Sequence, residues 1–449
     1  MRFQFLAFIA SSLMLVTTQA VADDWPRWMG PTANGVYREA GTVTTLPEVG
    51  LKVNWRIPIA GGYAGPAVVG SRVYLFDYVK TEGEAFNNPG QRADLEGSER
   101  LLCVDAKTGE TIWKYEYDCP YSISYPAGPR CTPTVDRSGP SDPGRVYILG
   151  SEGDLTCLDA ASGESIWRRN FKTDFKAQVP IWGFSAHPLV DGELVYCMVG
   201  GPDQTVVAFD KMTGEVKWKA LSASAAGYCP PSMITFAGVK QLMVWHADAI
   251  VGLDPLTGKE YWDMPIKPDF EMAIARPQRE GNLVYASAIR NNSVLFELAT
   301  DRPAVKELWR GEPKTSVYSA NSTPIMHDGI IYGTDCNEGS LMAVDAKNGD
   351  RLWTSFKPTK PDETRRVNHG TAFVTQLGDS DDFLLMSENG DLIRAKLTRS
   401  GYQETWRFHV LEPTGEAFGR GVVWSHPAYS NNTAYVRNDK ELVSVRLAN

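Results

Sequence analysis

The chain has 449 residues, 43% of them hydrophobic and 22% charged, which is an ordinary globular composition with enough length to bury a large core. The net charge is −9 and no basic run occurs, so nucleic acids and anionic lipid surfaces are poor candidate partners. A count of 13 Trp is high and calls for a structural explanation.

The first 22 residues are predicted to be a secretory signal peptide. Arg2 supplies a minimal basic region, residues 5–16 form an apolar core, and Ala20 and Ala22 fit a small-residue cleavage site before Asp23. The apolar run is too short to span a bilayer comfortably, so we expect no transmembrane segment after cleavage. The mature domain would be residues 23–449, located in the periplasm or outside the cell.

A ten-residue string then repeats along the chain. "VDAKTGETIW" ends at Trp113, and its close or degenerate copies recur with a period of about 50 residues. Each copy ends in a tryptophan, and these tryptophans are Trp55, Trp113, Trp167, Trp218, Trp262, Trp309, Trp353 and Trp406. The first of them, Trp55, lacks the preceding half of the repeat.

Each repeat also contains a strand, a tight turn and a second strand, as in residues 187–199, 276–288 and 323–335. A third strand leads into a recurrent Asp (105, 159, 210, 254 and 345 along the chain), a Gly-containing turn follows, and the strand that holds Trp comes last. Four short antiparallel strands per repeat predict the blade of a β-propeller. The Asp residues would cap turns, and each indole would fill the wedge between two blades, so the string is predicted to be structural.

The chain ends predict how the ring closes. Residues 439–449 resemble a third strand without its partner, and residues 51–59 resemble a fourth strand without a third. Side by side they would complete the last blade. We therefore predict an all-β fold, an eight-bladed propeller of four-stranded antiparallel blades closed by the N- and C-terminal strands. A polar insertion from Lys80 to Arg100 is predicted to be a loop within the first blade.

Seven Cys in an exported protein permit disulfides. Cys119 and Cys131 flank a short loop and form the most plausible pair. The spacing of Cys and His does not match a zinc site, and no metal site is predicted.

The innermost strand of most blades begins near an x-Pro step, and these steps should surround one mouth of the axial channel. Non-repeating aromatic and polar residues at that mouth are candidates for a small-molecule site, and the histidines among them could bind metal or move protons. Loop histidines and aromatics also commonly pack against neighbours or stay solvated, and no catalytic residue is assigned. The candidates are Trp182, His187, Tyr228, Arg276, Tyr318, Asn321, His369, Trp424 and His426.

The repeated strings resemble the tryptophan-docking motif of the PQQ-like, quinoprotein-type propeller family, and residues 24–37 and 181–218 also resemble its secreted bacterial members. One branch comprises alcohol and sugar dehydrogenases that hold PQQ and calcium, with an adjacent Cys pair, an Asp base and calcium ligands. This chain has no adjacent Cys pair, and its residues cannot be matched one by one to the Asp base or the calcium ligands. The chain is also too short to contain the long catalytic insertions of those enzymes. The BamB-like branch comprises eight-bladed, non-catalytic periplasmic propellers that scaffold outer-membrane protein assembly.

The size, the predicted export and the predicted blade number resemble the BamB-like branch more than the dehydrogenase branch. The chain departs from the BamB-like branch in lacking the lipobox Cys that would carry a lipid anchor. The resemblance therefore implies a non-catalytic, monomeric scaffold with protein partners in the cell envelope and no cofactor. The alternative is a PQQ- and calcium-dependent oxidoreductase of the alcohol or sugar dehydrogenase type. A carbohydrate-binding or hydrolytic propeller ranks last, because the predicted wedge positions already account for much of the Trp content.

Overall fold

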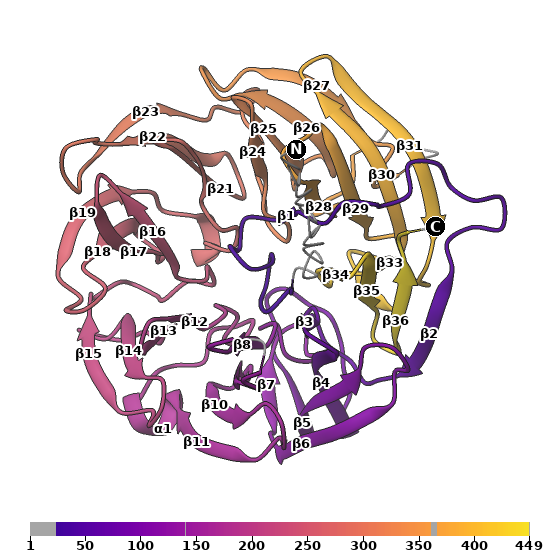
Figure 1. The fold of residues 1–449 in the computed structure, drawn as a ribbon. Helices are drawn as coiled ribbons and strands as arrows, with labels where there is room; N and C mark the ends of the chain where they lie inside the picture. Colours follow the sequence, from indigo (N-terminus) through magenta and orange to yellow (C-terminus); the bar gives the residue numbers. More distant parts are fainter. Residues whose placement is uncertain (1–23, 140, 361–365, 449) are drawn as a thin grey trace, which may run out of the picture.

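The structure is a computed structural model that describes residues 24–139, 141–360 and 366–448. Eight small sheets are arranged radially in a ring around a central channel (Figure 1), so the predicted eight-bladed propeller is confirmed. The predicted signal peptide, residues 1–22, lies outside the described residues. Within the described part of the chain, no helix combines the length and the apolar character needed to cross a membrane.

The first four blades follow one another along the chain, each running from the channel outward. Blade 1 contains β3 (Ala67–Val69), β4 (Arg72–Glu82), β5 (Ala93–Asp105) and β6 (Thr111–Asp118). Blade 2 contains β8 (Thr134–Asp136), β9 (Arg145–Leu149), β10 (Asp154–Asp159) and β11 (Ser165–Asn170). Blade 3 contains β12 (Leu189–Asp191), β13 (Leu194–Met198), β14 (Val206–Asp210) and β15 (Val216–Ala220). Blade 4 contains β16 (Ser232–Phe236), β17 (Val239–Trp245), β18 (Ala249–Leu253) and β19 (Glu260–Pro265).

The last four blades continue the ring. Blade 5 contains β20 (Gln278–Glu280), β21 (Leu283–Ala288), β22 (Asn292–Leu298) and β23 (Val305–Arg310). Blade 6 contains β24 (Ile325–His327), β25 (Ile330–Asp335), β26 (Ser340–Asp345) and β27 (Arg351–Ser355). Blade 7 contains β28 (Ala372–Leu377), β29 (Asp382–Ser387), β30 (Asp391–Thr398) and β31 (Gly401–His409). Blade 8 contains β34 (Ala428–Ser430), β35 (Thr433–Arg437), β36 (Glu441–Arg446) and the N-terminal β2 (Val53–Pro58).

Short elements connect or extend the blades. They are β1 (Val36–Tyr37), β7 (Tyr121–Ile123), helix α1 (Phe171–Phe175), the 3-10 helix η1 (Asp269–Glu271), and the hairpin of β32 (Gly415–Ala417) and β33 (Arg420–Val422). Strand β7 pairs with the start of β5, and β1 pairs in parallel with β28.

Strands from the two ends of the chain close the ring. Strand β2 pairs antiparallel with β36, and the register runs from Val53 opposite Val445 to Pro58 opposite Glu441. Leu442, Val443 and Val445 are fully buried in the cluster that joins blade 8 to its neighbours. The predicted closure by terminal strands is therefore confirmed, and it completes the four-stranded sheet of blade 8 with β2 as its outermost strand.

The repeated turn has the local chemistry that the sequence indicates. In blade 1, Oδ1 of Asp105 accepts hydrogen bonds from the backbone N–H groups of Lys107 and Thr108, each at 2.9 Å. Gly109 follows at φ +77°, a left-handed conformation that glycine adopts without a steric penalty. Both Asp bonds recur in the turns of blades 2, 3 and 4, and the first of them recurs in blade 6.

The indole of each repeat lies against the next blade. The Nε1–H of Trp113 donates to the carbonyl of Ala160 in the turn of blade 2 at 3.2 Å, and Trp218 donates to Pro255 in the turn of blade 4 at 3.0 Å. Trp262 differs, because its Nε1–H donates to Oε1 of Gln241 in its own blade at 2.7 Å. The next blade carries the degenerate turn at residues 299–304, and the Trp262 ring packs against Phe296 of that blade with ring centroids 5.9 Å apart.

The prediction about the insertion in blade 1 needs correction. The insertion from Lys80 to Arg100 is mostly strand, because β4 continues to Glu82 and β5 begins at Ala93, so the loop spans residues 83–92. The tip of this hairpin contacts other loops, since the Nδ2 of Asn87 donates to the carbonyl of Glu416 at 2.5 Å and Nη1 of Arg92 donates to that of Ser122 at 2.6 Å.

The predicted disulfide is absent, since Cys119 and Cys131 are free buried thiols. Cys119 packs in the core between blades 1 and 2, whereas Cys131 packs in the core between blades 2 and 3. The short loop that separates the two residues in sequence therefore places them in different cores.

A leader, residues 24–52, precedes β2 and crosses the centre of the ring (Figure 1). Trp25 and Val68 exchange backbone hydrogen bonds at 2.8 Å in both directions, which attaches the leader to the innermost strand of blade 1. The pairing of β1 with β28 attaches it to blade 7. The leader thus closes part of the channel and helps to shape the cavities described below.

Candidate functional site

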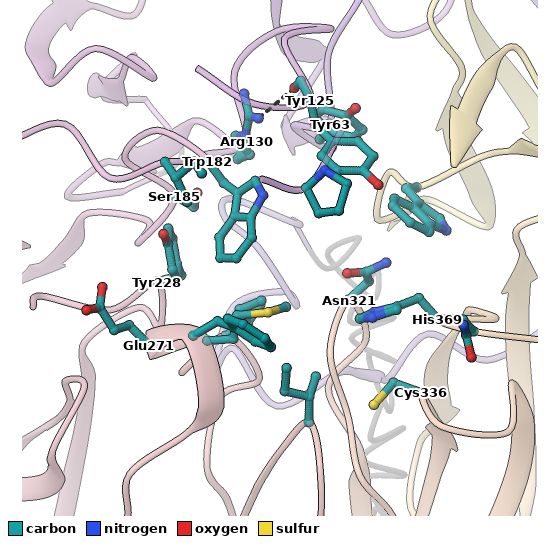
Figure 2. Close-up of a pocket in the computed structure, with 18 of the residues that line it drawn as sticks. Tyr63, Tyr125, Arg130, Trp182, Ser185, Tyr228, Glu271, Asn321, Cys336 and His369 are labelled. Atoms are coloured by element: carbon teal, nitrogen blue, oxygen red, sulfur yellow. Dashed lines mark hydrogen bonds between the residues drawn. The ribbon is translucent and has the colours of Figure 1, made fainter. Parts of the chain in front are cut away.

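A cavity of about 940 Å³ opens at the end of the channel where the innermost strands begin (Figure 2). Its wall includes residues immediately before β8, β12, β16 and β34, among them Thr132, His187, Pro230 and His426. Four of the seven x-Pro steps along the chain therefore contribute a residue to this channel mouth. We call this space the mouth pocket.

Most of the sequence-predicted site residues line the mouth pocket: Trp182, His187, Tyr228, Asn321, His369, Trp424 and His426. Tyr318 does not, because its ring is fully buried behind the wall and its hydroxyl donates to the carbonyl of Glu312 at 2.6 Å. Arg276 lines a second, smaller cavity on the leader side instead. The pattern identified the mouth, whereas a ligand-binding role for these residues stays a prediction.

Aromatic rings form the walls of the mouth pocket. Trp182 and Tyr228 contact each other with ring centroids 5.5 Å apart, and both appear on one side of the pocket in Figure 2. On the opposite side, His369 stacks on Phe418 at 5.0 Å with an interplanar angle of 4°. The pocket therefore presents flat apolar surfaces that suit stacking with rings or packing of apolar side chains.

Arg130 brings a positive charge into this aromatic wall. Its guanidinium donates to the backbone carbonyls of Ser124 at 2.9 Å, Tyr125 at 2.6 Å and Gly128 at 2.7 Å, and it lies 5.1 Å from the ring centroid of Tyr63. Within the described residues it has no carboxylate at ion-pair distance. Burial lowers the pKa of Arg130 and raises the pKa of Tyr63. Sequence analysis missed Arg130, which lies in a non-repeating loop.

The histidines of the pocket are neutral at pH 7. Burial lowers the pKa of His187 and of His369 to about 4, and burial with repulsion from His187 lowers the pKa of His426 to about 3. Nδ1–H of His187 donates to the carbonyl of Ser185 at 3.0 Å, so its Nε2 is an acceptor, and that atom is buried without a partner in the described structure. The imidazoles can therefore accept hydrogen bonds from a ligand but carry no charge at neutral pH.

Trp28 from the leader contacts two of these histidines. Its ring centroid lies 4.9 Å from that of His187 and 5.3 Å from that of His426, in edge-on geometry with both. Trp28 therefore forms the floor of the mouth pocket, where the leader closes the channel. The repeat analysis did not identify it, because the leader has no counterpart in the blades.

The donor set of the pocket does not fit a calcium ion. Ca²⁺ takes about six to eight oxygen ligands, usually including several carboxylates. Glu271 is the one carboxylate among the lining residues, and the described part of the chain has no group of three or more His, Cys, Asp or Glu side chains arranged for a metal. The aromatic walls and Arg130 would suit a flat anionic group such as PQQ. The lining does not contain the adjacent Cys pair of the PQQ-dependent dehydrogenases, however, because Cys336 is its single cysteine.

The relatives found by comparison with known proteins include a BamB protein and quinohemoprotein alcohol dehydrogenases. The outer membrane protein assembly factor BamB of Burkholderia pseudomallei is 23% identical to the chain, over 57% of the chain and 74% of that protein. The quinohemoprotein alcohol dehydrogenase ADH-IIG of Pseudomonas putida is 31% identical, over 29% of the chain. The aligned part spans less than a fifth of that enzyme, at 18% of its length.

Solved structures share the fold. BamB from Moraxella catarrhalis superposes with a TM-score of 0.56 at 14% identity, covering 88% of this chain and 97% of that one. The quinohemoprotein alcohol dehydrogenase from Comamonas testosteroni superposes with a TM-score of 0.57 at 14% identity, covering 95% and 81%. The family model for the outer membrane protein assembly factor BamB matches residues 97–355, which is more than half of the chain. The protein therefore belongs to this BamB family of PQQ-like propellers.

Proposed function

We propose that the protein is an exported, non-catalytic propeller that serves as a protein-interaction scaffold in the cell envelope. The observation that carries the proposal is the composition of the mouth pocket, where aromatic rings and neutral histidines accompany a single carboxylate, Glu271. Such a surface favours packing and hydrogen bonding over metal-assisted chemistry. The extent of the match to a BamB protein, 74% of its length, supports the same function.

The rim of the pocket suits a partner that inserts apolar side chains. Phe270 is 59% exposed and Phe418 is 46% exposed, and both lie at the pocket beside buried or half-buried aromatic residues. Large aromatic side chains that surround a concave site are typical of the centres of protein interfaces. The partner we infer is an exported or outer-membrane protein with an extended segment whose aromatic or aliphatic side chains enter the mouth pocket.

Affinity capture from the envelope fraction of the source bacterium tests this function. The bait is the mature protein, compared with a Trp182→Ala, Phe418→Ala double variant that removes one ring from each side of the pocket. Leu256→Ala is the control, because Leu256 is 76% exposed in the turn of blade 4 and does not line the pocket. We expect the wild type and the control to retain a defined envelope protein that the double variant loses. Equal capture by all three baits, or no specific capture by the wild type, would contradict the proposal.

The second candidate is a PQQ-dependent oxidoreductase, which the 31% identity to a quinohemoprotein alcohol dehydrogenase and the aromatic walls around Arg130 favour. Its test is an absorbance titration of the mature protein with PQQ, with and without calcium, followed by a dye-linked alcohol oxidation assay. Stoichiometric quinone binding together with alcohol oxidation would replace the scaffold proposal. Absence of both leaves the scaffold as the supported function.

A further inference from the structure

A second cavity, of about 390 Å³, lies between the leader and the innermost strands β12 and β16. Its lining includes Arg27 from the leader, Asp191 at the end of β12, Lys240 in β17 and Arg276 just before β20. It shares Trp28, His187 and Pro230 with the mouth pocket, so the Trp28 indole and the His187 ring stand in the wall between the two spaces. We call this space the leader pocket.

Positive charge predominates in the leader pocket, although the whole chain carries a net charge of −9. Arg27, Lys240 and Arg276 are its cationic lining residues, and Asp191 is its one carboxylate. Lys240 already forms an ion pair with Asp191. The two guanidinium groups therefore contribute the excess charge.

The nearby carboxylates do not neutralise these arginines. Asp191 and Asp136 act on Arg27 electrostatically, but Asp191 pairs with Lys240, and Asp136 pairs with Lys211 at 3.1 Å between Oδ2 and Nζ. Within the described part of the chain, neither Arg27 nor Arg276 has a carboxylate at ion-pair distance. A guanidinium removed from water without an anionic partner is costly, because desolvation is not offset by Coulombic attraction.

The hydrogen bonds of the two arginines use only part of their donor capacity. Nε and Nη2 of Arg27 donate to the carbonyl of Pro31 at 3.2 and 2.7 Å, and Nη1 of Arg276 donates to the carbonyl of Ala33. These bonds hold the leader in place. The Nε–H of Arg276, however, is buried without a partner.

The two charges also oppose each other. Burial lowers the pKa of Arg276 to about 10, with partial compensation by Cys229 and a further decrease from the charges of Arg27 and Arg279. Both guanidiniums remain protonated at neutral pH, and an anion between them would relieve the desolvation and the repulsion together. Neutral donors could hold the Pro31 and Ala33 carbonyls equally well, so leader attachment alone does not explain two charged residues at this place.

We propose that the leader pocket binds a small, doubly charged oxyanion between Arg27 and Arg276, with Lys240 at its edge. Guanidinium groups present planar pairs of N–H donors that match the oxygen atoms of phosphate and carboxylate groups. The volume of about 390 Å³ exceeds that of an inorganic ion, so the ligand is a phosphate monoester or a dicarboxylate with a small organic part. Because Arg27 belongs to the leader and Arg276 to the ring, the bound anion also fixes the leader across the channel.

Calorimetric titration of the mature protein with inorganic phosphate and with malonate, at constant ionic strength set by chloride, tests this site. We expect saturable binding of at least one dianion, and the stronger of the two identifies the phosphate or the dicarboxylate class. Arg27→Gln and Arg276→Gln should each weaken binding about tenfold, because each removes a charge-assisted contact. Arg279→Gln is the matched control, since Arg279 is an exposed arginine of β20 outside the pocket that bonds to the Gly281 carbonyl at 2.8 Å.

Two further variants separate ligand contact from folding. Arg276→Lys keeps the charge but loses the paired N–H donors, so it should bind more weakly than the wild type and more tightly than Arg276→Gln. Lys240→Gln alters a half-exposed side chain of β17, so it should leave the fold intact and weaken binding a few-fold. The proposal is overturned if the wild type binds neither dianion above the chloride background, or if Arg27→Gln, Arg276→Gln and Lys240→Gln all bind as the wild type does.

Discussion

At the scale of single residues, the indoles between blades combine apolar contact with one directed hydrogen bond. Trp218 illustrates the arrangement, since its Nε1–H reaches the Pro255 carbonyl at 3.0 Å and its ring lies beneath Gly258 in the same turn. Each such ring joins two blades that share no ladder hydrogen bonds. Burial of indole surface with a satisfied N–H is among the larger contributions that one side chain can make.

Trp218→Ala should therefore destabilise the protein by about 3 kcal/mol, since it removes apolar contacts and one of the two donors to the Pro255 carbonyl, the other being the Tyr196 hydroxyl. The measurement is chemical denaturation followed by circular dichroism. Val216→Ala on the same strand is the control, because Val216 is 40% exposed and should change the unfolding free energy by less than about 0.5 kcal/mol. Equal effects of the two substitutions would show that the indole contributes no more than an ordinary surface side chain.

The buried histidines predict a specific dependence of stability on pH. Burial and the charge of His187 lower the pKa of His426 to about 3, whereas the unfolded chain titrates near the ordinary value of 6.5. The unfolded state therefore binds more protons between these values, and stability is fully present above pH 6.5 and falls as the pH decreases toward 3. His426→Phe keeps a ring against Trp28 and removes the titrating group. The decline in unfolding free energy between about pH 6 and pH 4 should become shallower by up to about 1.4 kcal/mol per pH unit.

His409 supplies a control of opposite sign. Burial alone would lower its pKa, but hydrogen bonds and attraction from Asp391 and Glu412 prevail and raise it. Its contribution is therefore present below the ordinary histidine pKa and is lost as the pH rises. His409→Gln should cost more stability at pH 6 than at pH 8. If the His426→Phe variant had the same dependence of unfolding free energy on pH in acid as the wild type, protonation of His426 would not contribute to acid unfolding.

At the scale of elements, repetition determined what the sequence could predict. The blades were predictable because the same Asp-capped turn and the same x-Pro step recur, and local chemistry fixes both. The leader was not, because the place of Trp28 depends on packing against His187 and His426 and has no periodic counterpart. Likewise, the period places Tyr318 near the mouth, but it does not determine that its ring points into the protein.

The repeated turn also predicts where a methyl group is not tolerated. Gly163 has φ +77°, and a Cβ added there would lie 2.5 Å from Cε3 of Trp113 in the preceding blade. Gly192, in the hairpin turn of blade 3, has a similar φ of +59° but has open space around such a Cβ. Alanine would introduce backbone strain at both sites, whereas a collision with the indole would arise only at Gly163.

Gly163→Ala should therefore lower the unfolding free energy by about 1–3 kcal/mol more than Gly192→Ala does. Thermal unfolding of both variants measures the difference. A second check is Trp113→Phe, whose smaller ring should reduce the additional penalty of Gly163→Ala in the double variant. Equal destabilisation by the two glycine substitutions would show that the turn and the indole are not in tight contact.

At the scale of the whole molecule, the ring depends on a junction between the two ends of the chain. Strands β2 and β36 lie nearly 400 residues apart in sequence, yet they form one ladder from Val53–Val445 to Pro58–Glu441. Pairing of such distant segments forms late and is entropically costly, so its stability rests on the buried side chains beneath it. Val443 is fully buried in that cluster.

Val443→Ala should therefore raise amide hydrogen exchange in β2 and β36 together, because loss of about 2 kcal/mol at the junction promotes opening of both strands. Hydrogen exchange with mass spectrometry resolves peptides from the two ends. Val284→Ala in β21 is the control, since it removes the same two methyl groups from a fully buried site in blade 5, away from the junction. Its effect should appear in blade 5 and leave β2 protected. If Val443→Ala increased exchange in β36 while β2 kept the protection of the wild type, the two terminal strands would not open as one unit, and the closed ring would be held by contacts other than this ladder.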